Sequence, residues 1–335
     1  RDAFAPASGR RTYACFGSSA AEFGPRALKA VRQDMLTRDW SRRYANKQVG
    51  RIKQMFKWAV AEELVPPSVY HGLQAVAGLK RGRSSARETD AVQPVADGLI
   101  EPTKRFVSKQ VAAMIDLQLL TGARPGEIVI MRPCDIDKCG PVWTYRPSEH
   151  KTQHHGHERV IFIGPKAQAV LNPYLLRPPE AYCFSPAQAE RQRRDARHEQ
   201  RVTPLSCGNG PGTNRQDAPR KKPGEHYRTQ SYGRAISQGC LKAFPLPGPL
   251  AILDGETDEQ WTARLGEAGM GQVREWRKAH HWHPHQLRHN YATMVRREYG
   301  LEAAQVLLGH STADVTQVYA ERDMDRATEV ARKIG

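Results

Sequence analysis

The sequence predicts a mainly helical α+β protein that carries a small β hairpin and is built from two domains. Apolar residues recur at helical spacing in both halves of the chain. Two strand-like runs, Val142–Tyr145 and Val160–Ile163, flank a polar stretch, as in a hairpin. Residues 81–104 hold few large apolar side chains, which is typical of a linker. The chain has 335 residues, enough for two domains with hydrophobic cores.

The first expected domain covers residues 1–80 and is helical. Val49, Ile52, Phe56 and Val60 recur three or four residues apart and so share one face of a helix. We expect the prolines at 66 and 67 to end that helix and a second one to follow. The basic residues on its other sides fit either a DNA-binding face or an ordinary solvated surface. The domain is short, so its first helix is expected to lie outside this sequence.

The second expected domain covers residues 105–335. A helix over Val107–Leu120 should stop at Gly122, and another is predicted over Lys166–Leu176. Residues 186–228 are rich in arginine, glycine and proline and poor in apolar residues. This composition predicts a disordered or loosely ordered basic insertion, either a solvated loop or a segment that contacts phosphates.

The C-terminal part carries the clearest helical pattern. A helix is expected over His285–Arg297, ending before Gly300, and a short one over Glu302–Leu308, stopped by Gly309. Two more helices are expected beyond it. The first carries Val315, Val318 and Tyr319, and the second is amphipathic over Asp323–Ile334.

Net charge and composition indicate which classes of partner the chain should bind. The formal net charge is +16, from 51 Lys and Arg against 35 Asp and Glu, so the chain should bind polyanions. Nucleic acid is the commoner partner for such a chain; an anionic membrane surface, or simple solubility, are the alternatives. No apolar run approaches the roughly 20 residues of a membrane span. None of the six cysteines forms a CxxC pair, so free thiols in a reducing cytoplasm are the simplest account.

Several short motifs follow one another in the second domain. They are Thr-Gly-Ala-Arg-Pro-Gly-Glu at 121–127, His-Lys-Thr at 150–152, His-Gln-Leu-Arg-His at 285–289, Leu-Leu-Gly-His-Ser at 307–311, and Tyr319. In this order they resemble the signature of the tyrosine recombinases, or phage integrase family. The resemblance covers about residues 107–335 as the catalytic domain, and the helical segment before it is similar to the family's core-binding domain. The connection from Phe184 to His285 is longer than is usual for the family.

The resemblance assigns a role to each residue. Arg124 and Arg288 would hold the non-bridging oxygens of a DNA phosphate through charge-assisted hydrogen bonds. Tyr319 would be the nucleophile, and His285, three residues before Arg288 on one helix face, would exchange its proton. Lys151 would be the general acid, and His310 would donate a hydrogen bond to the phosphate. Glu127 would support the site by orienting Arg124 or His285.

The expected partner is double-stranded DNA, bound by a homo-tetramer on paired sites in the cytoplasm, at the nucleoid. No cofactor, ATP or metal is expected. The histidines near 280–289 lack acidic or cysteine partners at metal-ligand spacing. Two other functions stay open. A type IB topoisomerase shares similar phosphotyrosyl chemistry, and a regulator on the same fold would bind DNA without cutting it.

Overall fold

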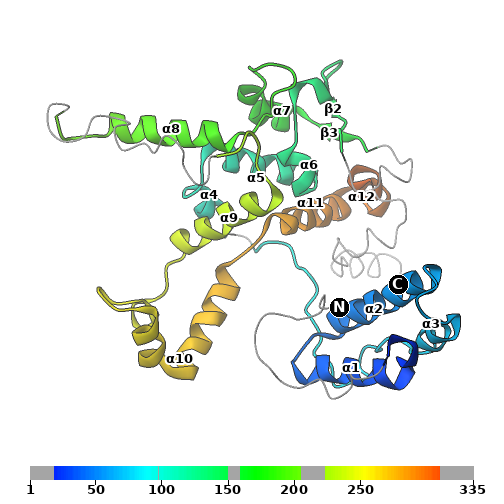
Figure 1. Cartoon of the computed structure of the whole chain (residues 1–335). Coiled ribbons are helices and arrows are strands. Elements are labelled where there is room, and N and C mark those ends of the chain that lie inside the picture. Colours follow the sequence, from blue (N-terminus) through cyan, green and yellow to red (C-terminus); the bar gives the residue numbers. More distant parts are fainter. Residues whose placement is uncertain (1–18, 97, 150–158, 205–222, 310–335) are drawn as a thin grey trace, which may run out of the picture. The chain divides into compact units, whose positions relative to one another are not determined.

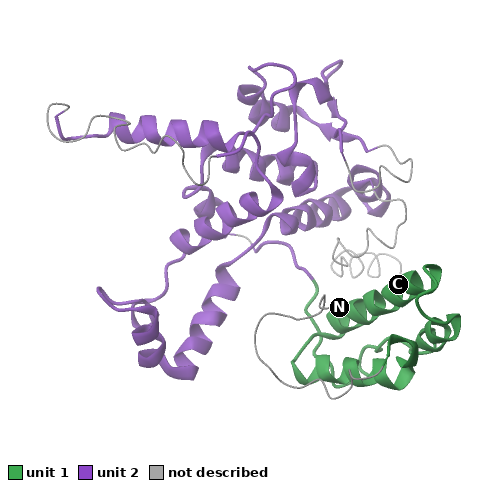
Figure 2. Cartoon of the chain, viewed as in Figure 1, with its two compact units in different colours: residues 1–91 green, residues 92–335 purple. Residues whose placement is uncertain are grey.

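The structure is a computed structural model that describes residues 19–96, 98–149, 159–204 and 223–309. The chain divides into two compact units, residues 1–91 and residues 92–335 (Figure 2). Its described part is mostly helical with one small sheet, so the predicted fold class is confirmed. The division between the units falls inside the stretch 81–104 that we expect to link two domains.

The first unit is a small helical domain around its own core. Its helices are α1 (Pro25–Thr37), α2 (Arg42–Ala61) and α3 (Pro67–Gln74), preceded by a 3₁₀ turn, η1 (Ala20–Glu22). Ser41 caps α2, because its hydroxyl accepts a hydrogen bond from the amide of Tyr44. The expectation that the two prolines end α2 is wrong. That helix stops at Ala61, and Pro67 opens α3 at a position where a missing amide hydrogen costs nothing.

One side of α2 is basic and exposed. Val49 and Phe56 are buried in the core of the unit, while Arg43, Lys47 and Arg51 are exposed at four-residue spacing on another side. We call these three residues the α2 basic face. The helix contains no acidic residue, so no intrahelical ion pair neutralises that face.

The second unit begins with the docked linker and continues to the C-terminal helices. Its helices are α4 (Ile100–Lys104), α5 (Lys109–Thr121), α6 (Pro125–Val129), α7 (Pro165–Leu171), α8 (Pro186–Glu199), α9 (Thr229–Ala243), α10 (Asp258–His280), α11 (Pro284–Tyr299) and α12 (Leu301–Leu308) (Figure 1). Its 3₁₀ turns are η2 (Pro133–Asp135), η4 (Asn172–Tyr174) and η5 (Gly248–Leu250). The helices expected at 107–120, 285–297 and 302–308 correspond to α5, α11 and α12 and are confirmed.

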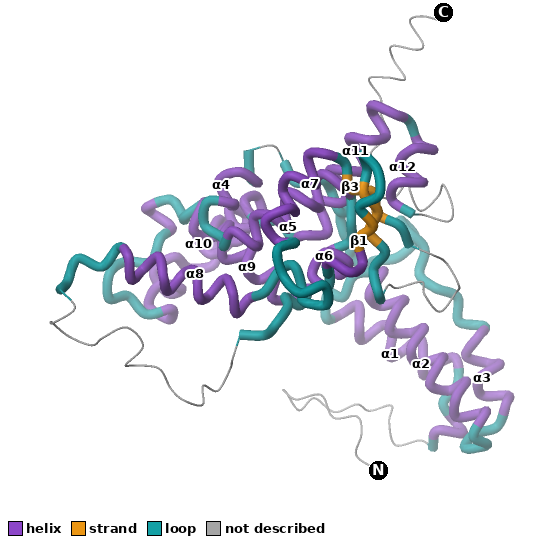
Figure 3. The backbone as a smooth tube through the Cα atoms, turned by 90° about the horizontal axis from the view of Figure 1, so that it is seen from above, coloured by secondary structure: helices purple, strands orange, loops and turns teal. Residues whose placement is uncertain are grey.

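A three-stranded antiparallel sheet lies beside α5, α7 and α12 (Figures 1 and 3). Its strands are β1 (Ile136–Asp137), β2 (Trp143–Tyr145) and β3 (Ile161–Ile163), in that order. Trp143 pairs with Ile163 and Tyr145 with Ile161, which confirms the predicted pairing of the two strand runs. Ile161 and Ile163 are buried and Phe162 is exposed, so one face of β3 belongs to the core of the unit.

Two expectations for this unit are corrected. The helix expected over Lys166–Leu176 ends at Leu171 and continues only as the turn η4, because Pro173 cannot extend an α-helix. The expected loose insertion at 186–228 begins as α8, while residues 205–222 lie outside the described part. Ser185 caps α8, and Glu190 pairs with arginines three and four residues further on, which favours a helix.

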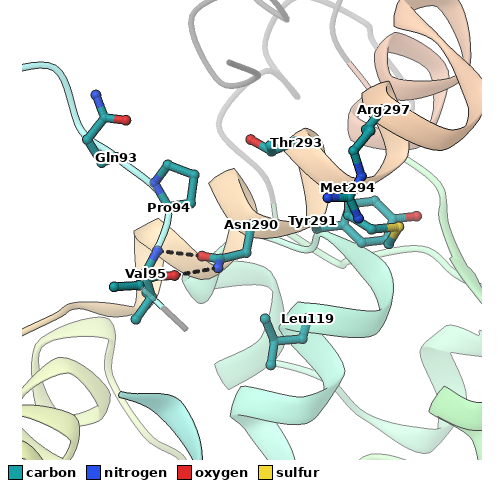
Figure 4. Close-up of a pocket in the computed structure, with 10 residues that line it drawn as sticks. Gln93, Pro94, Val95, Leu119, Asn290, Tyr291, Thr293, Met294 and Arg297 are labelled. Atoms are coloured by element: carbon teal, nitrogen blue, oxygen red, sulfur yellow. Dashed lines mark hydrogen bonds between the residues drawn. The ribbon is translucent and has the colours of Figure 1, made fainter. Parts of the chain in front are cut away.

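Residues 93–96 of the expected linker pack against α11. The side-chain amide of Asn290 on α11 exchanges two hydrogen bonds with the backbone of Val95, at 2.7 and 2.9 Å (Figure 4). Gln286, one turn earlier, donates to the carbonyl oxygen of Gln93. Residues 93–96 thereby form one wall of a pocket of about 550 Å³, and Tyr291 and Arg297 of α11 line another. One face of α11 is therefore occupied by this segment, and α4 follows directly after it.

Candidate active site

The site is centred on Arg288, whose side chain is fully buried on α11. Its Nη1 donates to the carbonyl oxygen of Gly122 at 2.5 Å and its Nη2 to that of Leu308 at 2.7 Å. Gly122 caps the C-terminus of α5, and Leu308 is the last residue of α12. Helix C-termini carry partial negative charge, so two of them stabilise the buried guanidinium group. Carbonyl dipoles have no net charge, so these bonds leave the positive charge of Arg288 in place.

Gly122 allows α5 and α11 to approach one another closely. Its φ of 63° is left-handed, which ends α5 as expected from the sequence. A Cβ at this position would overlap Cδ1 of Tyr291 and lie 2.7 Å from Cε1 of the same ring. Only glycine therefore fits here, both for its backbone angle and for the ring beside it. The close approach brings the carbonyl group of Gly122 within reach of Arg288.

Arg124 is fixed by the carboxylate of Glu127. Arg124 precedes α6, whose third residue is Glu127. Glu127 is 3% exposed; its Oε2 accepts from the amide of Arg124 and its Oε1 from Nη1 of Arg124, both at 2.7 Å. The Tyr145 hydroxyl on β2 donates to the carbonyl oxygen of Glu127, which ties this turn to the sheet. Of the two residues that Glu127 is expected to orient, it therefore holds Arg124.

His285 lies in the electric field of both arginines. It is half-buried on α11, one turn before Arg288. Burial lowers the pKa of His285 to about 4, helped by nearby His289 and by the positive charges of Arg288 and Arg124. The imidazole is therefore neutral near pH 7. A neutral imidazole can accept a proton from a nucleophile, which is the role that the sequence assigns to it.

The other three predicted catalytic residues, Lys151, His310 and Tyr319, lie outside the described residues. The structure describes what comes next to two of them in the chain. The strands β2 and β3 flank residues 150–158, which include Lys151. Gly309, with a left-handed φ of 62°, ends α12 directly before His310.

Arg159 belongs to the same network, although the sequence did not single it out. It is 5% exposed, and its Nε donates to Oε1 of Glu127 at 3.3 Å, the oxygen that also accepts from Arg124. Burial alone would raise the pKa of Glu127, but Arg159 and Arg124 lower it, so this carboxylate stays ionised. The strand pattern contains the missed signal. Arg159 lies two residues before the buried Ile161, so the alternation of the strand, extended backwards, places Arg159 on the buried side, where a charged side chain is exceptional.

Within the described part of the chain, no group of three or more histidine, cysteine or acidic residues could hold a metal ion. A search of the same residues finds no helix both long and apolar enough to cross a membrane.

Residues 258–326, which include α10, α11 and α12, match the sequence profile described as the Phage integrase family. The tyrosine recombinase XerC of Pseudomonas aeruginosa strain PAO1 is 30% identical over 113 residues, covering 32% of this chain and 37% of that protein. The match thus spans little more than a third of the length of this curated relative.

Solved structures show where the fold belongs. The integrase of transposon Tn1549 in complex with a circular intermediate DNA aligns with a TM-score of 0.54 at 13% identity, covering 93% of this chain and 86% of that one. A lambda integrase tetramer bound to a Holliday junction aligns with a TM-score of 0.53 at 13% identity, covering 90% and 65%. Residues 258–326 therefore form a phage integrase family domain, and the chain shares the fold of these integrases.

Proposed function

We propose that the protein is a site-specific DNA recombinase or integrase that cuts and rejoins DNA strands through a covalent 3′-phosphotyrosyl link at Tyr319. The observation that carries the proposal is the joining of two arginines from distant parts of the chain. Arg288 bonds the carbonyl oxygen of Gly122, 166 residues away in the sequence and two residues before Arg124. This bond brings the turn that carries Arg124 to Arg288, and two neighbouring guanidinium groups suit the non-bridging oxygens of one phosphate.

In the proposed cleavage step, the Tyr319 oxygen attacks the scissile phosphorus and the bond from phosphorus to the 5′ oxygen breaks. The phenol loses its proton to His285, whose neutral imidazole can accept it. Lys151 gives a proton to the departing 5′ oxygen, so a hydroxyl group leaves. A 5′ hydroxyl from the same or another strand then reverses the step. Because the phosphodiester energy is kept in the phosphotyrosyl bond, the reaction needs no ATP.

The charge on the phosphate oxygens grows during attack, and the arginines stabilise it. Arg124 and Arg288 are positioned before the substrate arrives, so no reorganisation is needed as the charge develops. His310 donates a further hydrogen bond to the phosphate in this proposal. Glu127 acts through Arg124, which it holds by two hydrogen bonds.

The α2 basic face supports double-stranded DNA as the partner, because exposed basic residues at regular spacing can contact successive phosphates. We infer that the protein acts on DNA in the cytoplasm, at the nucleoid. We also propose that it works as a homo-tetramer on two paired sites, since recombination must hold two duplexes at once. The lambda integrase tetramer on a junction supports this assembly.

A suicide substrate tests the proposal. The substrate carries the attachment sequence that flanks the gene, with a nick that lets the 5′-hydroxyl fragment diffuse away after cleavage. Wild-type protein should form a DNA adduct that survives a denaturing gel. Tyr319→Phe should form none, and Tyr299→Phe is the matched control, since Tyr299 is 71% exposed and should not be needed.

An adduct that persists in Tyr319→Phe, or wild-type protein that forms none on its flanking site, would overturn the proposal. Relaxation of supercoiled plasmids that lack the site would instead identify a topoisomerase. Site-specific binding without any adduct would identify a regulator.

A further inference from the structure

We propose that Arg159 is a positioning residue of the strand-cleavage site, which keeps Glu127 from neutralising Arg124 and braces the C-terminal end of α12. The proposal rests on the proposed function, because its role is to prepare the arginines for a phosphate. It is carried by the contacts of Arg159, by its burial and by the charges of the cluster around it.

The contacts of Arg159 join two parts of the site. Its Nε bonds the carboxylate of Glu127, and its Nη1 donates to the carbonyl oxygen of Leu307 at 3.4 Å, in the last turn of α12. The next carbonyl along, that of Leu308, accepts from Arg288. Two buried arginines therefore bind successive carbonyl groups at the end of α12.

Gly309 fits this arrangement. A Cβ on Gly309 would overlap Nη1 of Arg159 and lie 3.3 Å from its Cζ, so the guanidinium group lies directly against the glycine backbone. The left-handed φ of 62° already favours glycine at this position. Gly309, which follows the last residue of α12, thus contacts the guanidinium group of Arg159. A change in Arg159 should shift the point from which the following residues start.

The charges of the cluster point in the same direction. Three guanidinium groups and one carboxylate leave two positive charges over Arg124, Glu127, Arg159 and Arg288. Without Arg159, Glu127 would offset Arg124 and one positive charge would remain over the other three. Since electrostatic effects are strong where water is excluded, that difference should weaken the attraction for a phosphate.

The cluster also contains a buried hydrogen-bond donor that is not used. Within the described residues, the buried Nη2 of Arg159 has no hydrogen-bond partner. An unused buried donor is costly, and so is an excess of buried positive charge. A phosphate bound at Arg124 and Arg288 would offset the excess of positive charge.

A charge-balance experiment tests this role. It measures single-turnover cleavage of the suicide substrate, DNA affinity and thermal unfolding for three variants. Arg159→Gln removes the positive charge and should slow cleavage by about tenfold to a hundredfold, the loss typical of an outer partner that orients a reacting group. Glu127→Gln in the Arg159→Gln background restores two positive charges and should recover at least tenfold of that loss. Arg159→Lys keeps the positive charge but loses the planar guanidinium group that bonds Glu127 and Leu307 at once. Its cleavage rate should therefore lie between those of wild type and Arg159→Gln.

Arg132→Gln is the matched control, because Arg132 also pairs with a carboxylate three residues away, on Asp135. It should cleave at the wild-type rate. If Arg159→Gln cleaves as fast as wild type, or if the double variant is no faster than Arg159→Gln, the inference is refuted. In both cases the wild-type adduct would leave the proposed function intact. If wild-type protein forms no adduct, the proposed function fails first. If Arg159→Gln does not fold, the comparison of Arg159→Lys with wild type decides, and equal cleavage rates would refute the inference.

Discussion

The change Gly122→Ala tests how closely the helix ends around Arg288 must approach. The left-handed φ of 63° costs an alanine about 1–2 kcal/mol. Overlap of the new Cβ with the Tyr291 ring adds roughly 1–3 kcal/mol, the usual cost of overpacking a core. The free energy of unfolding of the second unit should therefore fall by about 2–5 kcal/mol in total. Because the Gly122 carbonyl group holds Arg288, cleavage should fall as well.

Urea unfolding followed by tryptophan fluorescence measures this change, since Trp282 is buried in the same unit. Gly255→Ala is the matched control. Its φ is 78°, and a Cβ there meets nothing within 4 Å, so only the backbone cost of about 1–2 kcal/mol applies.

A second background separates the two costs. With Tyr291→Ala already in place, the ring is gone, and Gly122→Ala should cost only the backbone part, about 1–2 kcal/mol. If Gly122→Ala costs the same with and without the Tyr291 ring, the ring is not what excludes a side chain. The argument for a close approach of α5 and α11 would then be refuted.

Three further predictions concern the proposed activity. Arg124→Lys should lower single-turnover cleavage about 10²–10³-fold while DNA affinity changes little, because a point charge cannot fork onto two oxygens; equal losses of both would contradict this. His285→Gln should flatten the fall in the urea midpoint between about pH 6.5 and 4. The pKa of His285 is lowered to about 4, so stability is full above its unfolded value and is lost as protons bind in that interval; an unchanged acid limb would count against it. Replacing the α2 basic face with glutamines should lower the slope of log affinity against log salt by about 3, since each phosphate contact contributes about 0.9. The same charge change on α10 should have a smaller effect, and its exposed basic residues are Arg274, Arg277 and Lys278.

The sequence predicted the elements whose signals are local. Helical spacing and the glycine stops locate α5, α11 and α12, and alternation locates β2 and β3. The motif Thr-Gly-Ala-Arg-Pro-Gly-Glu encodes both the left-handed end of α5 and the proline that opens α6. These features depend on the conformation of a few neighbouring residues, which explains why they could be predicted without the fold.

The rest depends on contacts between distant residues. Composition suggested a loose insertion at 186–228, but the serine cap and the pairs of Glu190 make its first part helical. The docking of residues 93–96 requires Asn290, which lies 195 positions beyond Val95 in the chain. The partners of Arg288 are backbone carbonyl groups, and any residue type provides these. No residue pattern could therefore have identified them.

The three buried or half-buried arginines are held in two different ways, and the difference bears on function. Arg124 and Arg159 share the carboxylate of Glu127, whereas Arg288 donates to carbonyl oxygens at the ends of two helices. An ion pair with a carboxylate holds a guanidinium group firmly but offsets its charge, as Glu127 does for Arg124. Helix ends stabilise a cation through dipoles that carry no net charge. These two carbonyl bonds can therefore hold Arg288 in place and leave it able to attract an anion, which is the condition for stabilising the charge that would develop in the proposed strand cleavage.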